Sequence, residues 1–155
     1  MKQTRHFLSL LCVAILTACS PVQSIESSKN AVEEYDILIE QEILWTDCLS
    51  QEEPHYLVFA YSEKCSYCHE IMGDVLDFAA SGIVKTYFVD IKKEPNVVPI
   101  SNDIDETIGA TNVGDIFIMG TPTILEIENN TIKANVPGKD YCLTFLNEQR
   151  LLNKK

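Results

Sequence analysis

The chain has few basic residues: 12 Lys and Arg stand against 23 Asp and Glu among 155 residues, and its formal net charge is −11. A surface this acidic is repelled by the phosphate backbone of nucleic acids and by the anionic headgroups of lipids. We therefore expect no nucleic-acid partner and no attachment to a membrane through charge. The chain also lacks internal repeats and low-complexity tracts, which argues against a repeat architecture.

The apolar run that starts near Phe7 is too short to cross a bilayer as a stable helix. It follows Lys2 and Arg5, and a short apolar run after positive charges is the pattern of a secretory signal. The run leads into Leu16-Thr17-Ala18-Cys19, which resembles the lipobox of bacterial lipoproteins, in which the Cys becomes the lipidated first residue. We therefore expect lipidation of Cys19; the alternative is an ordinary cleavable signal in which this Cys has no role.

Cleavage at that motif would divide the chain into three parts. These are a signal peptide over residues 1–18, a lipid anchor with a Ser-rich tether over 19–34, and one domain over 35–155. The 137 residues left after cleavage suffice for a full hydrophobic core. Because the leader removes two basic residues and no acidic one, the mature chain has a formal charge of −13. We expect the lipid alone to hold the protein at the membrane, outside the cytoplasm.

Apolar patterning predicts an α/β domain with a mixed central sheet and helices on both of its faces. The continuous apolar run at 56–61 is typical of a central strand that is buried on both sides. Asn129 and Asn130 tolerate the positive φ of a tight hairpin turn. The expected strands cover residues 36–39, 56–61, 86–91, 123–127 and 131–136. The expected helices cover residues 40–50, 65–80, 104–108 and a C-terminal segment with Asp140 as N-cap and Leu143, Phe145, Leu146, Leu151 and Leu152 buried.

Four cysteines lie in the expected domain, an even number that suits an oxidising compartment. Cys48 and Cys142 could form a disulfide that ties the first helix to the last, or could pack separately as small buried apolar residues. Cys65 and Cys68 are only three positions apart. A disulfide that closes so short a loop contributes little stability, which favours a reactive role for this pair.

Cys65-Ser66-Tyr67-Cys68 follows the central apolar run, at the expected start of a helix. Only a thiolate attacks a disulfide, and the backbone N–H groups and dipole of a helix N-terminus stabilise that thiolate. Lys64 would add to this effect, whereas Glu63 and Glu70 oppose it. The three-residue spacing lets the second thiol reach the mixed disulfide that the first one forms. The motif therefore predicts dithiol redox chemistry.

Together with Gly120-Thr121-Pro122-Thr123 ahead of the expected hairpin, this motif resembles the thioredoxin family, over residues 35–152. The resemblance implies a thioredoxin-like fold in which Cys65 is the attacking thiol and Cys68 the resolving one. It also implies a cis bond at Pro122 near the thiols, with Thr121 pairing with the substrate chain. With the lipobox, the chain is most similar to membrane-anchored, extracytoplasmic thioredoxin-like proteins of bacteria.

Two positions depart from the family pattern. Lys64 stands where many thioredoxins have Trp, and Phe59 stands where many bury a proton-accepting acid, so we expect proton transfer through Glu63 or water. The intervening Ser66-Tyr67 matches neither the Gly-Pro of cytosolic reductases nor the Pro-His of strong periplasmic oxidants. Glu63, Lys64, Ser66 and Tyr67 are therefore the expected redox-tuning residues, and the direction of the reaction stays open.

The cysteine motif has two other interpretations, haem attachment and zinc binding. Cys68-His69 completes C-x-x-C-H, the attachment site of c-type haem, but haem leaves Thr121-Pro122 unexplained. A structural zinc site needs four protein ligands, and Cys65, Cys68 and His69 supply three. We therefore expect no metal and no cofactor.

The function expected from the sequence is a monomeric, lipid-anchored thiol-disulfide oxidoreductase, with the reductase direction favoured. Its expected partners are protein or peptide thiols and disulfides and a membrane redox protein. The alternatives are a disulfide oxidase, a non-catalytic accessory lipoprotein with a thioredoxin fold, and a c-type haem protein.

Overall fold

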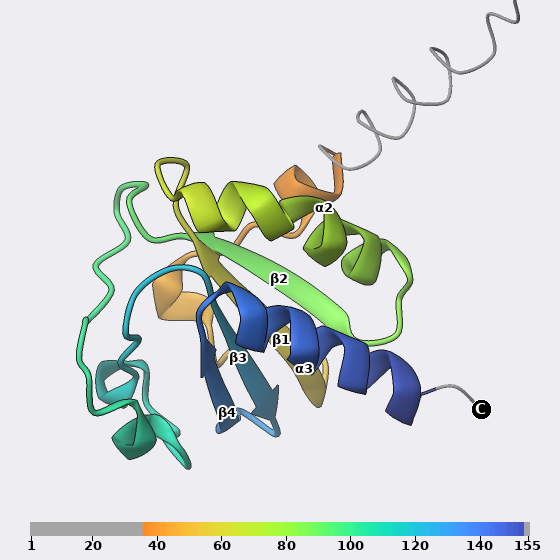
Figure 1. The fold of residues 1–155 in the computed structure, drawn as a ribbon. Coiled ribbons are helices and arrows are strands. Elements are labelled where there is room, and N and C mark those ends of the chain that lie inside the picture. Colours follow the sequence, from red (N-terminus) through yellow and green to blue (C-terminus); the bar gives the residue numbers. More distant parts are fainter. Residues whose placement is uncertain (1–35, 154–155) are drawn as a thin grey trace, which may run out of the picture.

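The computed structural model describes residues 36–153. The expected signal peptide over 1–18, the lipidated Cys19 and the tether up to residue 34 lie outside the described residues. The described part contains a four-stranded mixed sheet in the order β2-β1-β3-β4 (Figure 1). Within it, no helix has both the length and the apolar character that crossing a membrane requires.

The sheet is built around β1 (His55–Tyr61), in which every residue after His55 is buried. β2 (Lys85–Asp90) runs parallel to β1 on one side, and β3 (Thr123–Glu128) runs antiparallel to it on the other. β4 (Thr131–Pro137) completes the hairpin with β3. Asn129 and Asn130 form its turn with φ values of 49° and 56°, as expected for a tight hairpin turn. The four strands predicted from residue 56 onward are thus confirmed.

The two faces of the sheet are covered by different kinds of structure. The helices α2 (Ser66–Ala80) and α3 (Lys139–Leu152) contribute to a single core cluster on one face (Figure 1). The other face is covered by a second cluster, which includes Trp45, Ile116 and Ile118. The 3-10 helices of the described part are η1 (Trp45–Asp47), η2 (Ile104–Thr107) and η3 (Val113–Asp115). The prediction of helices on both faces is therefore correct, but the helices are long on one face and only short 3-10 turns on the other.

The expectation for residues 36–50 is wrong. Residues 36–40 are helical rather than a strand, and the extended pairing falls later, where Ile43 N–H donates to the Phe88 carbonyl at 2.9 Å. The predicted helix over 40–50 is reduced to η1. The physical reason is that Leu38 packs against the α2–α3 cluster while Trp45 packs in the cluster on the opposite face. The segment must pass around the edge of the sheet, which one continuous helix could not do.

Two details of the other helices also differ from the sequence prediction. The 104–108 helix is the short 3-10 helix η2, and the residue that precedes α3 is Gly138 with φ 89°, in place of an Asp140 cap. Leu151 and Leu152 are exposed, because the buried stripe of α3 consists of Cys142, Leu146 and Gln149. This i, i+4, i+7 spacing defines one face of the helix. Leu151 and Leu152, in the last turn, point away from that face.

The same substitution at two leucines of α3 tests this packing. Leu146→Ala removes a side chain that is 1 % exposed and should cost about 2–5 kcal/mol of unfolding free energy. Leu151→Ala removes one that is 67 % exposed and should change it by less than about 0.5 kcal/mol. Urea denaturation of the two variants and the parent chain measures both values. Equal losses at the two positions would contradict the packing of α3.

Candidate dithiol site

Cys65 lies at the junction between the end of β1 and the start of α2. It is the N-cap residue of α2, with extended φ and ψ of −89° and 110°. Its Sγ accepts the backbone N–H of Cys68 at a distance of 3.2 Å, in the way a capping oxygen accepts an unpaired N–H of the first turn. The sulfur therefore sits where backbone donors and the helix dipole favour negative charge.

The 120–122 loop reaches the same sulfur from a distant part of the chain. The Thr121–Pro122 peptide bond is cis, as predicted. The Cys65 thiol donates to the Thr121 carbonyl oxygen, with 3.3 Å between sulfur and oxygen. Gly138, just before α3, donates its N–H to the Pro122 carbonyl at 2.7 Å. Three segments therefore meet at Cys65, and the structure brings the two halves of the predicted site together.

The two thiols differ in burial and in acidity. Burial alone raises the pKa of Cys65, but hydrogen bonds from the Cys68 and Thr121 side chains and from backbone N–H groups outweigh it, and the pKa lies below its ordinary value. Cys68 is fully buried, and burial together with the neighbouring Cys65 sulfur raises its pKa to about 12. Of the two thiols, Cys65 is therefore the one that ionises first as the pH rises.

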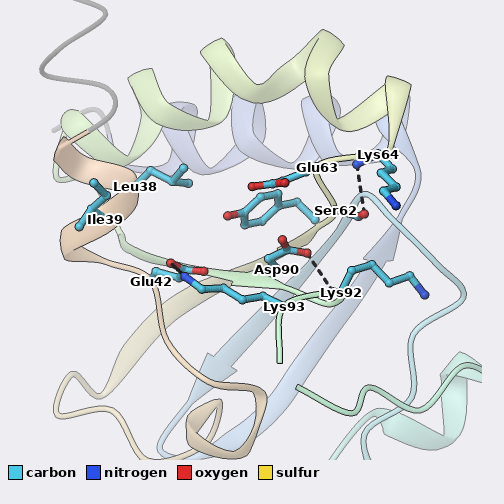
Figure 2. Close-up of a pocket in the computed structure, with 10 residues that line it drawn as sticks. Leu38, Ile39, Glu42, Ser62, Glu63, Lys64, Asp90, Lys92 and Lys93 are labelled. Carbon is cyan, nitrogen blue, oxygen red and sulfur yellow. Dashed lines mark hydrogen bonds and ion pairs between the residues drawn. The ribbon is translucent and has the colours of Figure 1, made fainter. Parts of the chain in front are cut away.

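No acid lies beneath the thiols on the central strand. Phe59 is fully buried, and its ring stacks on Tyr61 and meets Phe88 edge-on, with centroid distances of 6.1 and 6.2 Å. Carboxylates instead line two pockets that share the Ser62-Glu63 segment. Glu63 and Cys68 both line a pocket of about 490 Å³. A neighbouring pocket of about 630 Å³ contains Glu63 and the buried Asp90 (Figure 2). Glu63 is therefore a carboxylate that shares a pocket with Cys68.

The residues expected to tune the thiols surround the first turn of α2. Glu63, Lys64, Ser66 and Tyr67 are all exposed. His69 Nε2 lies 2.6 Å from the Glu63 carbonyl oxygen, so the imidazole holds the turn that leads into the helix.

Sequence reasoning missed Lys139 near the dithiol. Its Nζ lies 2.6 Å from a Glu70 carboxylate oxygen and 5.5 Å from the centre of the Tyr67 ring. Lys139 thus offsets the acidic charge of Glu70, which was expected to oppose the thiolate. The contact joins residues 69 positions apart, so no local pattern could have revealed it.

The possible second disulfide is absent. Cys48 and Cys142 are both free and buried. Cys48 packs with Trp45 in one cluster, whereas Cys142 packs with Cys68 in the cluster beneath the helices. The sheet separates them, and a disulfide requires Cα atoms within about 7 Å of each other. The alternative of two separately packed small residues is therefore correct, and burial raises the pKa of Cys142 to about 12.

The strand order, the C-x-x-C motif at the start of α2 and the cis-Pro before β3 define a thioredoxin-like fold. No family model and no curated protein matches the chain. Solved structures similar to it include thioredoxin f2 of Chlamydomonas reinhardtii, with 14 % identity, a TM-score of 0.47, and coverage of 70 % of this chain and 94 % of that one. Thioredoxin f of spinach chloroplast also has 14 % identity, with a TM-score of 0.44 and coverage of 77 % and 93 %. These similarities concern the fold.

The difference in acidity predicts which thiol reacts first. In the reduced chain near pH 7, Cys65 should be alkylated by iodoacetamide at least about tenfold faster than Cys68, since each pKa unit changes the thiolate fraction about tenfold. Its rate should rise with pH and level off below the ordinary thiol pKa. A timed pulse followed by digestion and mass spectrometry measures both sites, with buried Cys142 as the internal control. Faster reaction at Cys68 would reverse the assigned roles.

Proposed function

We propose that the protein is a thiol-disulfide oxidoreductase that exchanges its Cys65–Cys68 dithiol with substrate disulfides. The observation that carries the proposal is the position of the Cys65 sulfur. It accepts the Cys68 N–H at 3.2 Å and touches the Thr121 carbonyl beside the cis bond at 3.3 Å. The sulfur is half-buried and accepts hydrogen bonds from backbone N–H groups, which suits it to nucleophilic attack.

The reaction proceeds by two exchanges. The Cys65 thiolate attacks one sulfur of the substrate disulfide; a bond forms between the two sulfurs, the substrate S–S bond breaks, and the leaving sulfur takes up a proton. Cys68 then gives up its proton and attacks Cys65, which releases the second substrate sulfur as a thiol. Two electrons pass from the dithiol to the substrate, and a Cys65–Cys68 disulfide remains. A redox partner at the membrane would restore the dithiol.

The surroundings of Cys65 suit a polypeptide substrate. Pro122 and Met119 line a shallow pocket of about 230 Å³ together with Pro137 and Gly138, which precede α3. Tyr67 and Tyr141 line another of about 390 Å³. Met119, Tyr67 and Tyr141 are 48 %, 57 % and 72 % exposed, a set of apolar side chains around one reactive sulfur. This supports protein or peptide disulfides as substrates, with Thr121 available to pair with the bound chain.

The reductase direction is our first choice and the oxidase direction the alternative. The acidic Glu63 near Cys65 limits stabilisation of its thiolate, and a less stabilised dithiol is the better reductant. Hydrogen bonds to the Cys65 sulfur act the other way. A glutathione-buffer titration of the couple decides between the two directions.

Substitution of each cysteine tests the activity. Cys65→Ser should abolish disulfide reduction in an insulin assay, because the attacking sulfur is lost. Cys68→Ser should accumulate mixed disulfides between Cys65 and substrate, which mass spectrometry detects. Cys48→Ala, on the far face of the sheet, is the control and should retain activity. If the parent chain shows no dithiol cycling, the protein is the non-catalytic accessory alternative.

We further propose that residues 1–18 are removed and that lipid on Cys19 holds the mature chain outside the cytoplasmic membrane. Mass spectrometry of the mature N-terminus after expression in bacteria should show acyl mass on Cys19. Cys19→Ala should release the protein from the membrane fraction, because the acidic domain has no charge attraction to lipid. Cleavage at another position, with an unmodified Cys19, would refute the anchor.

A further inference from the structure

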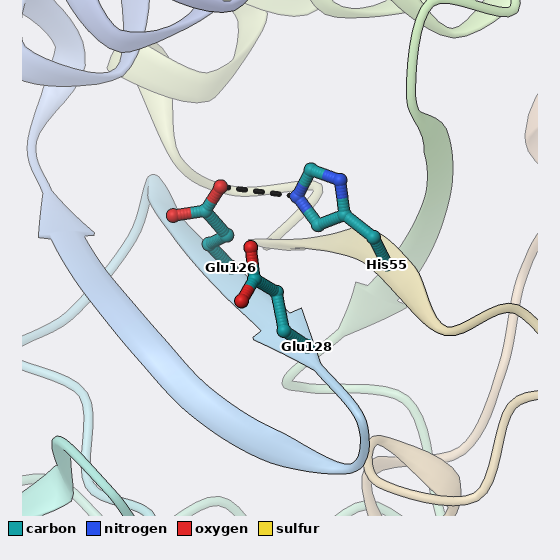
Figure 3. Close-up of side chains that lie close together, drawn as sticks. All are labelled: His55, Glu126 and Glu128. Atoms are coloured by element: carbon teal, nitrogen blue, oxygen red, sulfur yellow. Dashed lines mark hydrogen bonds and ion pairs between the residues drawn. The ribbon is translucent and has the colours of Figure 1, made fainter.

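A second cluster of ionisable side chains lies at the other end of the central strand. His55 opens β1, and it pairs directly with Glu128 at the end of β3. Glu126 is two residues before Glu128, so its side chain projects from the same face of the sheet. Figure 3 shows the three side chains pointing toward one another, and one ligand atom from each lies within 4.8 Å of the others.

The spacing of these atoms suits a shared metal ion. His55 Nε2 and Glu126 Oε1 are 3.0 Å apart. Zinc holds nitrogen and oxygen ligands at about 2.0–2.2 Å, so two ligands of one tetrahedral ion lie roughly 3.4 Å from each other. The distance between His55 Nε2 and Glu126 Oε1 is therefore already close to the distance between two ligands of one zinc ion. Glu128 is exposed and can close the remaining gap by a change of rotamer.

A buried neighbour orients one of the carboxylates. Gln149, which is 7 % exposed on the inner face of α3, donates its side-chain N–H to Glu126 Oε1 at 3.1 Å. Partners of this kind orient the ligands of metal sites and raise their affinity. Among the ion pairs of residues 36–153, Glu126 pairs only with His55, and Glu128 with no Lys or Arg. Two carboxylates thus share one imidazole, and the excess negative charge favours a divalent cation.

We propose that His55, Glu126 and Glu128 form a binding site for a divalent first-row metal ion of the zinc type, with water completing its coordination. One imidazole and two carboxylates suit Zn²⁺ and Co²⁺ better than they suit thiolate-seeking ions. On binding, the hydrogen bond between His55 and Glu126 is exchanged for coordination, with the imidazole proton on Nδ1. The ion would join the first residue of β1 to the end of β3.

This site is separate from the dithiol. From His55 to Tyr61 the strand rises by roughly 20 Å, at about 3.3 Å per residue, and Cys65 lies beyond that far end. An ion held by His55 therefore cannot reach the thiols, and the inference does not rest on the redox proposal. His55 and Glu126 are 71 positions apart, so no local pattern in the sequence indicates this cluster.

The test uses the full chain with Cys65→Ser and Cys68→Ser, so that the motif thiols cannot bind the metal. Calorimetric titration with ZnCl₂ should show one saturable site. His55→Ala in this background should weaken binding by about 100-fold, and Glu126→Gln and Glu128→Gln by at least about tenfold each. His69→Ala is the matched control, because this exposed histidine lies in the first turn of α2, beyond the other end of β1, and it should change the affinity less than about twofold.

Thermal unfolding provides a second readout. Excess ZnCl₂ should raise the melting temperature of the background chain and of its His69→Ala form, because a ligand that binds the folded state stabilises it. The His55→Ala form should not respond. Equal zinc affinity in the His55→Ala and His69→Ala forms, or the absence of a saturable site, would overturn the proposal. Should His55→Ala fail to fold, the exposed Glu128→Gln change decides in the same way.

Discussion

The burial of β1 on both faces is the constraint on which the rest of the structure depends. The strand pairs with β2 on one side and β3 on the other, and its alternating side chains supply both core clusters. Every backbone group of such a strand must be paired, and every side chain packed, so its position is closely defined. The segments that adjoin its two ends are therefore also held in closely defined positions. Cys65 follows one end, and His55 stands at the other.

The chemistry at Cys65 follows from a balance between burial and backbone donors. Burial disfavours a thiolate at Cys65, while hydrogen bonds from the first turn of α2 favour it and lower the pKa of this thiol. At Cys68, one turn further into the core, burial and the neighbouring Cys65 sulfur outweigh the hydrogen bonds that favour a thiolate, and its pKa is raised. Phe59 keeps the strand beneath the pair apolar, and Glu63 is a carboxylate that shares a pocket with Cys68. The two sulfurs of the site therefore differ in burial and in acidity.

Contacts between distant segments set the charges around both ends of β1. Lys139 of α3 reaches the first turn of α2 to pair with Glu70. At the opposite end, Gln149 of the same helix orients Glu126 beside His55. α3 therefore contributes to the electrostatics of two sites that lie at opposite ends of the sheet, in addition to covering one of its faces.

The sequence by itself determined the elements whose signals are local. Apolar runs placed the four strands, the Asn pair placed the hairpin turn, and C-x-x-C with Thr121-Pro122 identified the dithiol and the loop that meets it. Tertiary structure alone decided the path of residues 36–50, because the chain must pass the sheet edge to fill both clusters. It alone placed Cys48 and Cys142 on opposite faces and brought His55 beside two carboxylates of β3. These outcomes depend on contacts across strands and layers, which leave no periodic pattern in the chain.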